Sequence, residues 1–132
     1  MNRKAIIFGV KGTKLTIPEK KFLKFTKPWG IILFSRNIKN LSQLSKLVES
    51  IKKIFDDKKY PILIDQEGGR ISRLNRIMDL SFFPQKNLGN FYHYDKSKFQ
   101  SFYKNYINKI SMILNRVGIN INTVPVLDVY RK

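Results

Sequence analysis

The 132-residue chain contains no cysteine, a single histidine and no long apolar run. Without cysteine it has neither a disulfide framework nor thiolate chemistry. The one histidine, His93, has no partner for a catalytic triad or a zinc site, so we interpret it as a surface residue. The apolar run at residues 5–10 is too short for a signal-peptide core or a membrane span. We therefore expect a cytoplasmic protein without a membrane segment.

Acidic residues are also scarce. Nine Asp and Glu face 26 Lys and Arg, which gives a net charge of +17. The basic residues are spread in runs no longer than pairs, and 19 Lys, 17 Ile and 11 Asn accompany one Ala, a composition typical of an AT-rich genome. We therefore expect a solvated basic surface and no nucleic-acid partner. A nucleic-acid-binding domain with steeply salt-dependent affinity is the less favoured alternative.

Apolar runs alternate along the chain with amphipathic helices. The runs predict four strands, the first of them buried on both faces, at residues 5–10, 30–34, 61–64 and 119–129. Helical spacing predicts three helices, one from Pro18 and two at residues 41–55 and 96–117. Glycine and proline mark residues 68–95 as a long functional loop with about one helical turn. Trp29 is interpreted as a core residue, and stacking on a sugar is the alternative.

This order predicts an α/β fold with a parallel sheet, because every connection is long enough for a right-handed crossover. Four βα units fit either the first half of a TIM-type (β/α)8 barrel or a small doubly wound sheet. A complete barrel needs roughly 250 residues, and the chain ends within three residues of the fourth predicted strand. We therefore expect residues 1–132 to be the N-terminal portion of a barrel domain, truncated after its fourth strand.

Ligands of parallel α/β folds bind at the carboxyl ends of the strands. Three carboxylates, Asp65, Glu67 and Asp128, lie at predicted strand ends, where polar groups suit a hydroxyl-rich ligand. After Asp65, the pair Gly68-Gly69 allows a sharp turn before two arginines. A turn whose aspartate merely caps backbone N–H groups remains open as the alternative. The chain lacks the glycine spacing of a phosphate loop or a dinucleotide fold.

Three blocks resemble glycoside hydrolase family 3 in order and spacing. They are residues 28–37 (PWGIILFSRN), 64–74 (IDQEGGRISRL) and 125–129 (PVLDV). Within the family, the chain is most similar to bacterial cytoplasmic β-N-acetylhexosaminidases of cell-wall recycling. This resemblance implies that Asp65 accepts hydrogen bonds from hydroxyls of N-acetylglucosamine and that Arg73 contacts the same sugar. It further implies a set of residues that brace the pocket, namely Arg36, Glu67, Arg70 and Asp128.

The same resemblance places the family's catalytic groups beyond Lys132: an aspartate nucleophile on a late strand and a histidine acid/base on a loop after the fifth. We therefore assign no catalytic residue, no metal and no organic cofactor to this chain. The full-length relative is expected to remove β-linked N-acetylglucosamine from muropeptides with retention. The alternative is a sugar-binding half-barrel without catalysis, paired with itself or with a separate second half, because its two sheet edges are open.

Overall fold

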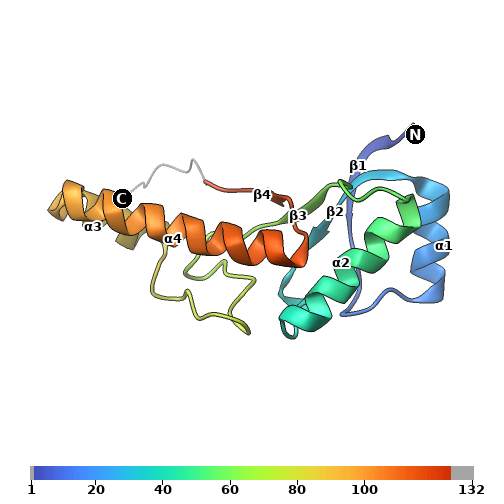
Figure 1. The fold of residues 1–132 in the computed structure, drawn as a ribbon, viewed down its shortest axis with the longest axis horizontal. Helices are drawn as coiled ribbons and strands as arrows, with labels where there is room; N and C mark the ends of the chain where they lie inside the picture. The colour runs from blue at the N-terminus through green and yellow to red at the C-terminus, as the bar shows by residue number, and fades with distance from the viewer. Residues whose placement is uncertain (1, 126–132) are drawn as a thin grey trace.

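The computed structural model describes residues 2–125 of the chain. Strands and helices alternate along it, and four strands form one parallel sheet in the order β1-β2-β3-β4 (Figure 1). The strands are β1 (Lys4–Gly9), β2 (Pro28–Leu33), β3 (Ile62–Ile64) and β4 (Ile121–Asn122). The predicted parallel α/β fold is confirmed. Residues 126–129 of the predicted fourth strand, and Asp128 with them, lie outside the described residues.

Four α-helices and one short 3-10 helix connect the strands. They are α1 (Ile17–Thr26), η1 (Ser35–Asn37), α2 (Leu41–Phe55), α3 (Gln85–Tyr94) and α4 (Lys96–Val117). The bounds of α2 and α4 match the prediction because both helices have strong end signals. The Asn40 side chain accepts the backbone N–H of Gln43, and the Asp95 side chain accepts that of Lys98. Gly118 ends α4 in the left-handed conformation, with φ of 83°.

Helix α3 corrects the prediction of a long loop at residues 68–95. Its apolar face packs on the helix that follows it: Leu88 is only 4% exposed, and Phe91 contacts the rings of Phe99 and Phe102 in α4. The pair Gly89-Asn90 suggested a turn, but an added Cβ at Gly89 would meet nothing within 4 Å. This glycine lowers helix propensity without preventing the helix, since tertiary packing outweighs propensity.

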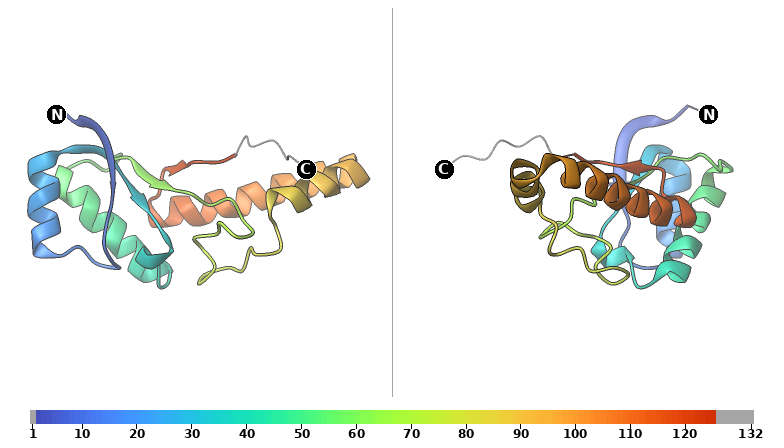
Figure 2. Two further views of the ribbon diagram at one scale, coloured as in Figure 1. Left: turned by 180° about the vertical axis from the view of Figure 1, so that it is seen from behind. Right: turned by 60° about the vertical axis from the view of Figure 1, so that its left-hand side comes forward.

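The helices α1, α2 and α4 lie side by side on one face of the sheet (Figures 1 and 2). The alternate strand residues directed at this layer have no exposed surface, and they are Ile31, Leu33, Ile62 and Ile64. They share one apolar cluster with the buried stripe of α2, which consists of Leu44, Leu47, Val48, Ile51 and Phe55. The core of the described part of the chain therefore lies between this face and the helices.

Strand β1 and the beginning of β2 correct two expectations. Strand β1 was predicted to be buried on both faces, yet Ile6 and Ile7 are 42% and 43% exposed. Ile7 lies beside Gly30 in the register and therefore points to the face opposite the helices, and β1 is also an edge of the sheet, pairing only with β2. Trp29, predicted to be in the core, is 41% exposed at the beginning of β2. Together with Ala5 these side chains line an open apolar hollow.

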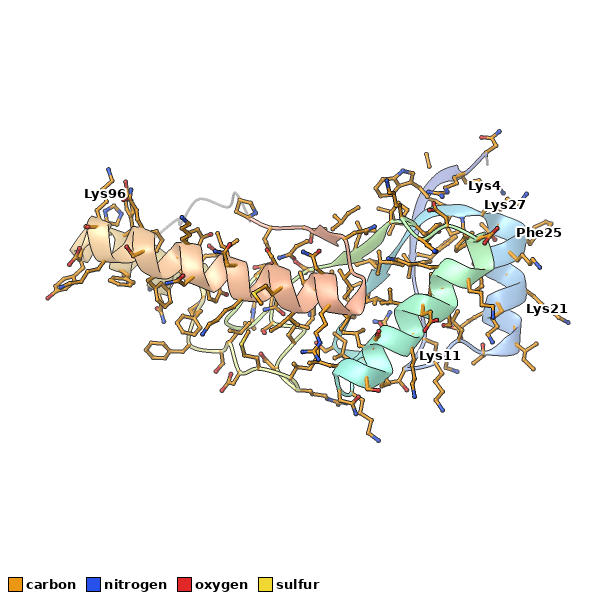
Figure 3. All side chains as sticks on the ribbon, in the orientation of Figure 1. Lys4, Lys11, Lys21, Phe25, Lys27 and Lys96 are labelled. Atoms are coloured by element: carbon orange, nitrogen blue, oxygen red, sulfur yellow. The ribbon has the colours of Figure 1, made fainter. Side chains whose placement is uncertain are left out.

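The basic side chains are distributed over the molecule (Figure 3). The labelled lysines come from several elements: Lys4 from β1, Lys21 from α1, and Lys96 from the far end of α4. His93 lies exposed near the end of α3, as expected. None of the helices in residues 2–125 is long and apolar enough to cross a membrane.

Candidate functional site

The loops that follow β1 and β2 are fastened together at the carboxyl end of the sheet. Asn37 is completely buried, and its amide donates to the carbonyl oxygens of Val10 at 3.0 Å and Gly12 at 2.9 Å. Its side-chain oxygen accepts the backbone N–H of Phe34 at 2.9 Å. Arg36 adds a hydrogen bond from Nε to the same Val10 carbonyl, at 3.1 Å. These bonds fix one side of the rim on which a ligand of this fold would rest.

The loop after β3 brings two of the predicted site residues into contact. Arg73 Nη2 lies 2.9 Å from Asp65 Oδ2, and both side chains remain about a quarter exposed, at 23% and 24%. The chain returns to Asp65 because Gly68 and Gly69 have φ of 91° and 59°. A Cβ at Gly68 would lie 2.4 Å from the Phe83 carbonyl oxygen, so only glycine fits this turn. The result is a carboxylate and a guanidinium that both reach solvent.

Gln66 links the end of β3 to the segment that carries Arg73. Its side chain is 1% exposed, and its Oε1 accepts the backbone N–H groups of Arg73 at 2.8 Å and Leu74 at 2.9 Å. Its Nε2 donates to Ser72 Oγ at 3.0 Å. Asn122 at the end of β4 accepts the Gln66 backbone N–H at 3.1 Å. The strand-end loops are thus held by buried amides.

None of these amides was predicted as a site residue, because only charged side chains were assigned roles there. Asn37 and Gln66 stand in the singled-out blocks 28–37 and 64–74 without a role, and Asn122 ends β4. The signal in the sequence that could have identified them is an uncharged amide residue next to a charged residue at a strand end. It can satisfy several backbone groups without adding charge to the pocket.

The Phe34 ring contacts both arginines at the rim. The guanidinium carbon of Arg36 lies 4.6 Å from the centroid of the Phe34 ring, and that of Arg73 lies 5.5 Å from it. A Cβ at Gly9 would come within 3.0 Å of Arg36 Nη2 and 3.2 Å of Phe34 Cε2. The lack of a side chain at position 9 therefore leaves room for the stacked pair. Arg36 packs on the ring while Arg73 also pairs with Asp65.

The remaining predicted residues are less closely joined to this pair. Arg70 is exposed, and no hydrogen bond or ion pair within residues 2–125 connects it with Asp65. Glu67 is partly buried, and its backbone carbonyl accepts Gln85 Nε2 at 3.2 Å. Across the same range, no group of three or more His, Cys, Asp and Glu side chains is placed to hold a metal ion.

The arrangement suits hydrogen bonding to a polyhydroxyl ligand. The Asp65 carboxylate accepts from hydroxyls, and the Arg73 guanidinium donates to hydroxyl or carbonyl oxygens. A parallel sheet covered by helices on one face, with this polar rim at the carboxyl ends of its strands, defines part of a β/α-barrel protein.

Comparison with known proteins narrows this class. A β-hexosaminidase of Nitrosospira multiformis is 30% identical over 128 residues, which cover 93% of this chain and 35% of the relative. The zinc-ion complex of NagZ from Neisseria gonorrhoeae superposes with a TM-score of 0.84 at 30% identity, covering 96% of this chain and 38% of NagZ. A glycoside hydrolase family 3 β-N-acetylglucosaminidase from Paenibacillus gives 0.74 at 28% identity, covering 93% of this chain and 23% of that enzyme.

No protein-family model matches the chain. Over nearly all of its length the chain is nevertheless similar, in sequence and in fold, to the N-terminal part of NagZ-like bacterial enzymes and of a glycoside hydrolase family 3 β-N-acetylglucosaminidase. It spans little more than a third of the length of the Nitrosospira relative and of NagZ.

Proposed function

We propose that this chain forms the sugar-binding front part of a β-N-acetylhexosaminidase that removes terminal β-linked N-acetylglucosamine from cell-wall muropeptides. The Asp65–Arg73 pair carries this proposal, because it presents an acceptor and a donor at the mouth of β3. A further structure of NagZ from Neisseria gonorrhoeae, at TM-score 0.81 and 29% identity, is a complex with N-trifluoroacetyl-D-glucosamine. A ligand of that chemistry supports N-acetylglucosamine as the sugar here.

In this proposal Asp65 and Arg73 bind and orient the non-reducing sugar but do not react with it. A retaining glycosidase needs a nucleophile and an acid about 5 Å apart on opposite sides of the bond that is cleaved. Asp65 Oδ2 already accepts from the Arg73 guanidinium, and its carboxylate is arranged as a hydrogen-bond acceptor toward a hydroxyl-rich ligand. The catalytic groups are assigned to the rest of the barrel, so this chain alone should not hydrolyse glycosides.

The open side of the sheet supports a second half-barrel as partner. Ile7 and Trp29 are exposed beside the free edge of β1, although such apolar side chains favour burial. Further βα units of the same kind, in continuation of the chain or as a separate half, would pair with this edge. Self-association through the same edge is the alternative. A cytoplasmic location, where muropeptides are recycled, belongs to the same proposal.

Titration of the chain with N-acetylglucosamine, followed by NMR of the backbone amides, tests the sugar site. We expect signals of the loop at residues 65–74 to move, and Asp65→Asn or Arg73→Lys to weaken binding about tenfold or more, as for lost hydrogen bonds to charged groups. Glu49→Gln and Arg116→Lys are matched controls, because both side chains are exposed on helices away from the loop. If the site variants bind N-acetylglucosamine as tightly as the control variants, the proposed sugar site at Asp65 and Arg73 is wrong.

A further inference from the structure

The position of Arg73 depends on more than its ion pair. Asp65 holds the tip of the side chain, whereas the backbone of residue 73 is placed by Gln66, which accepts the N–H groups of Arg73 and Leu74 on one oxygen atom. Gln66 is itself immobilised, since its backbone N–H bonds to Asn122 and its side chain is 1% exposed. One buried amide therefore connects the ends of β3 and β4 with the segment that carries the guanidinium.

We infer that Gln66 is a positioning residue, which sets Arg73 opposite Asp65 before the sugar arrives. The expected effect on sugar binding rests on the proposed function, whereas the placement of Arg73 by Gln66 does not depend on it. A neutral amide suits the task because it accepts two backbone protons and donates to Ser72. It also adds no charge that would compete with Asp65 for the guanidinium.

The alternatives to Gln66 hold Arg73 less firmly. The Phe34 ring contacts the guanidinium from one side only, with the guanidinium carbon 5.5 Å from the ring centroid. Arg73 Nε is buried and has no hydrogen-bond partner among residues 2–125. With its side chain anchored at one nitrogen, Arg73 keeps its direction only if its backbone is fixed. Preorganisation of this kind lowers the ordering cost of ligand binding.

The buried Arg73 Nε–H provides a direct probe. We would measure its proton exchange rate by 15N NMR in the ligand-free chain, and the dissociation constant of N-acetylglucosamine in parallel. Gln66→Met keeps the length of the side chain but removes both acceptor bonds. We expect its Arg73 Nε–H to exchange at least about tenfold faster and its sugar affinity to fall about tenfold. Gln66→Glu keeps an oxygen that accepts both N–H groups and should restore slow exchange, while its charge competes with Asp65 for the guanidinium and should leave the sugar affinity lowered.

Ser72→Ala is the matched control, because it removes only the contacts of the Ser72 hydroxyl with Gln66 Nε2 and Oε1 and leaves the two backbone N–H bonds at Oε1. It should leave exchange and affinity within about twofold of the original chain. Leu74→Ala controls for general destabilisation, since it opens the core beside the loop without removing an acceptor. If Gln66→Met does not fold, Gln66→Asn, whose amide is one methylene too short, takes its place against Gln66→Glu.

The outcomes separate the two proposals. Unchanged Arg73 exchange and affinity in Gln66→Met, or equal changes in Leu74→Ala, would show that Gln66 has only a structural role. If the original chain does not bind N-acetylglucosamine, the proposed function fails. The exchange rates still decide whether Gln66 positions Arg73. Faster exchange in Gln66→Met with rescue by Gln66→Glu supports the inference in either case.

Discussion

On the helix-covered face of the sheet, Ile31 of β2 has no exposed surface, whereas Ile7 on the neighbouring strand β1 is 43% exposed. The two residues are close in the sheet, since Ile7 is paired with Gly30 in the parallel register. The difference arises from the face on which each lies: α1, α2 and α4 pack on the face that bears Ile31, whereas Ile7, beside Gly30, points to the opposite face. Burial here depends on the helices more than on the hydrophobic character of a strand.

Replacing each isoleucine by alanine tests this contrast with one chemical change. Ile31→Ala should lower the free energy of unfolding by about 2–5 kcal/mol, because it leaves a cavity in the packed core. Ile7→Ala should cost less than about 1 kcal/mol, because much of its side chain already contacts water. Urea denaturation of the two variants measures both values. A loss of similar size at Ile7 would mean that β1 is covered in solution, by a second copy or another segment.

The same contrast explains how far the sequence alone leads. Runs such as residues 30–34 and 61–64 predicted the strands of the core, because local apolar character and burial agree there. The exposure of Ile7 and Trp29 could not be predicted, since it depends on which elements cover an edge. Helix α3 was missed because its ring contacts with α4 are not visible in its own residues.

The candidate site was foreseeable in part. The order of residues 65–73 suggested that Asp65 and the arginines lie together, and the structure brings Asp65 and Arg73 into contact. Their role toward sugar stays a prediction. The partner of Arg36 was not foreseeable, because its stacking on Phe34 depends on the space left by Gly9. Strand ends mark where a site lies, whereas packing decides which side chains meet there.

Gly68 and Gly89 also differ in how closely they are packed, and we expect smaller changes in the free energy of unfolding when each is replaced by alanine. Gly68→Ala should destabilise the chain by about 1–3 kcal/mol, because φ is 91° and the new Cβ would clash with the Phe83 carbonyl. Gly89→Ala should stabilise it by about 0.5–1 kcal/mol, since the residue is helical with open space around it. Thermal and urea unfolding of both variants checks these signs. Destabilisation by Gly89→Ala would mean that α3 is not helical in solution.

Tyr60 and Tyr94 give the smallest and most specific test. Tyr60 has no exposed surface, stacks on Phe55 at 4.0 Å and donates its hydroxyl to the Pro28 carbonyl at 2.7 Å, whereas Tyr94 is 90% exposed. Tyr60→Phe should lower the free energy of unfolding by about 1 kcal/mol near neutral pH, and Tyr94→Phe should leave it unchanged.

The pH dependence of this difference follows from the Tyr60 pKa, which burial raises from 10.0 to about 12. The folded state favours the neutral phenol, so its stabilising contribution is complete below pH 10 and declines as the pH rises toward about 12. The free-energy difference between the original chain and Tyr60→Phe, measured by urea unfolding from pH 7 to 11, should therefore be constant at first and shrink above pH 10. A difference that stays constant to pH 11 would mean that the Tyr60 hydroxyl is hydrated and its pKa ordinary.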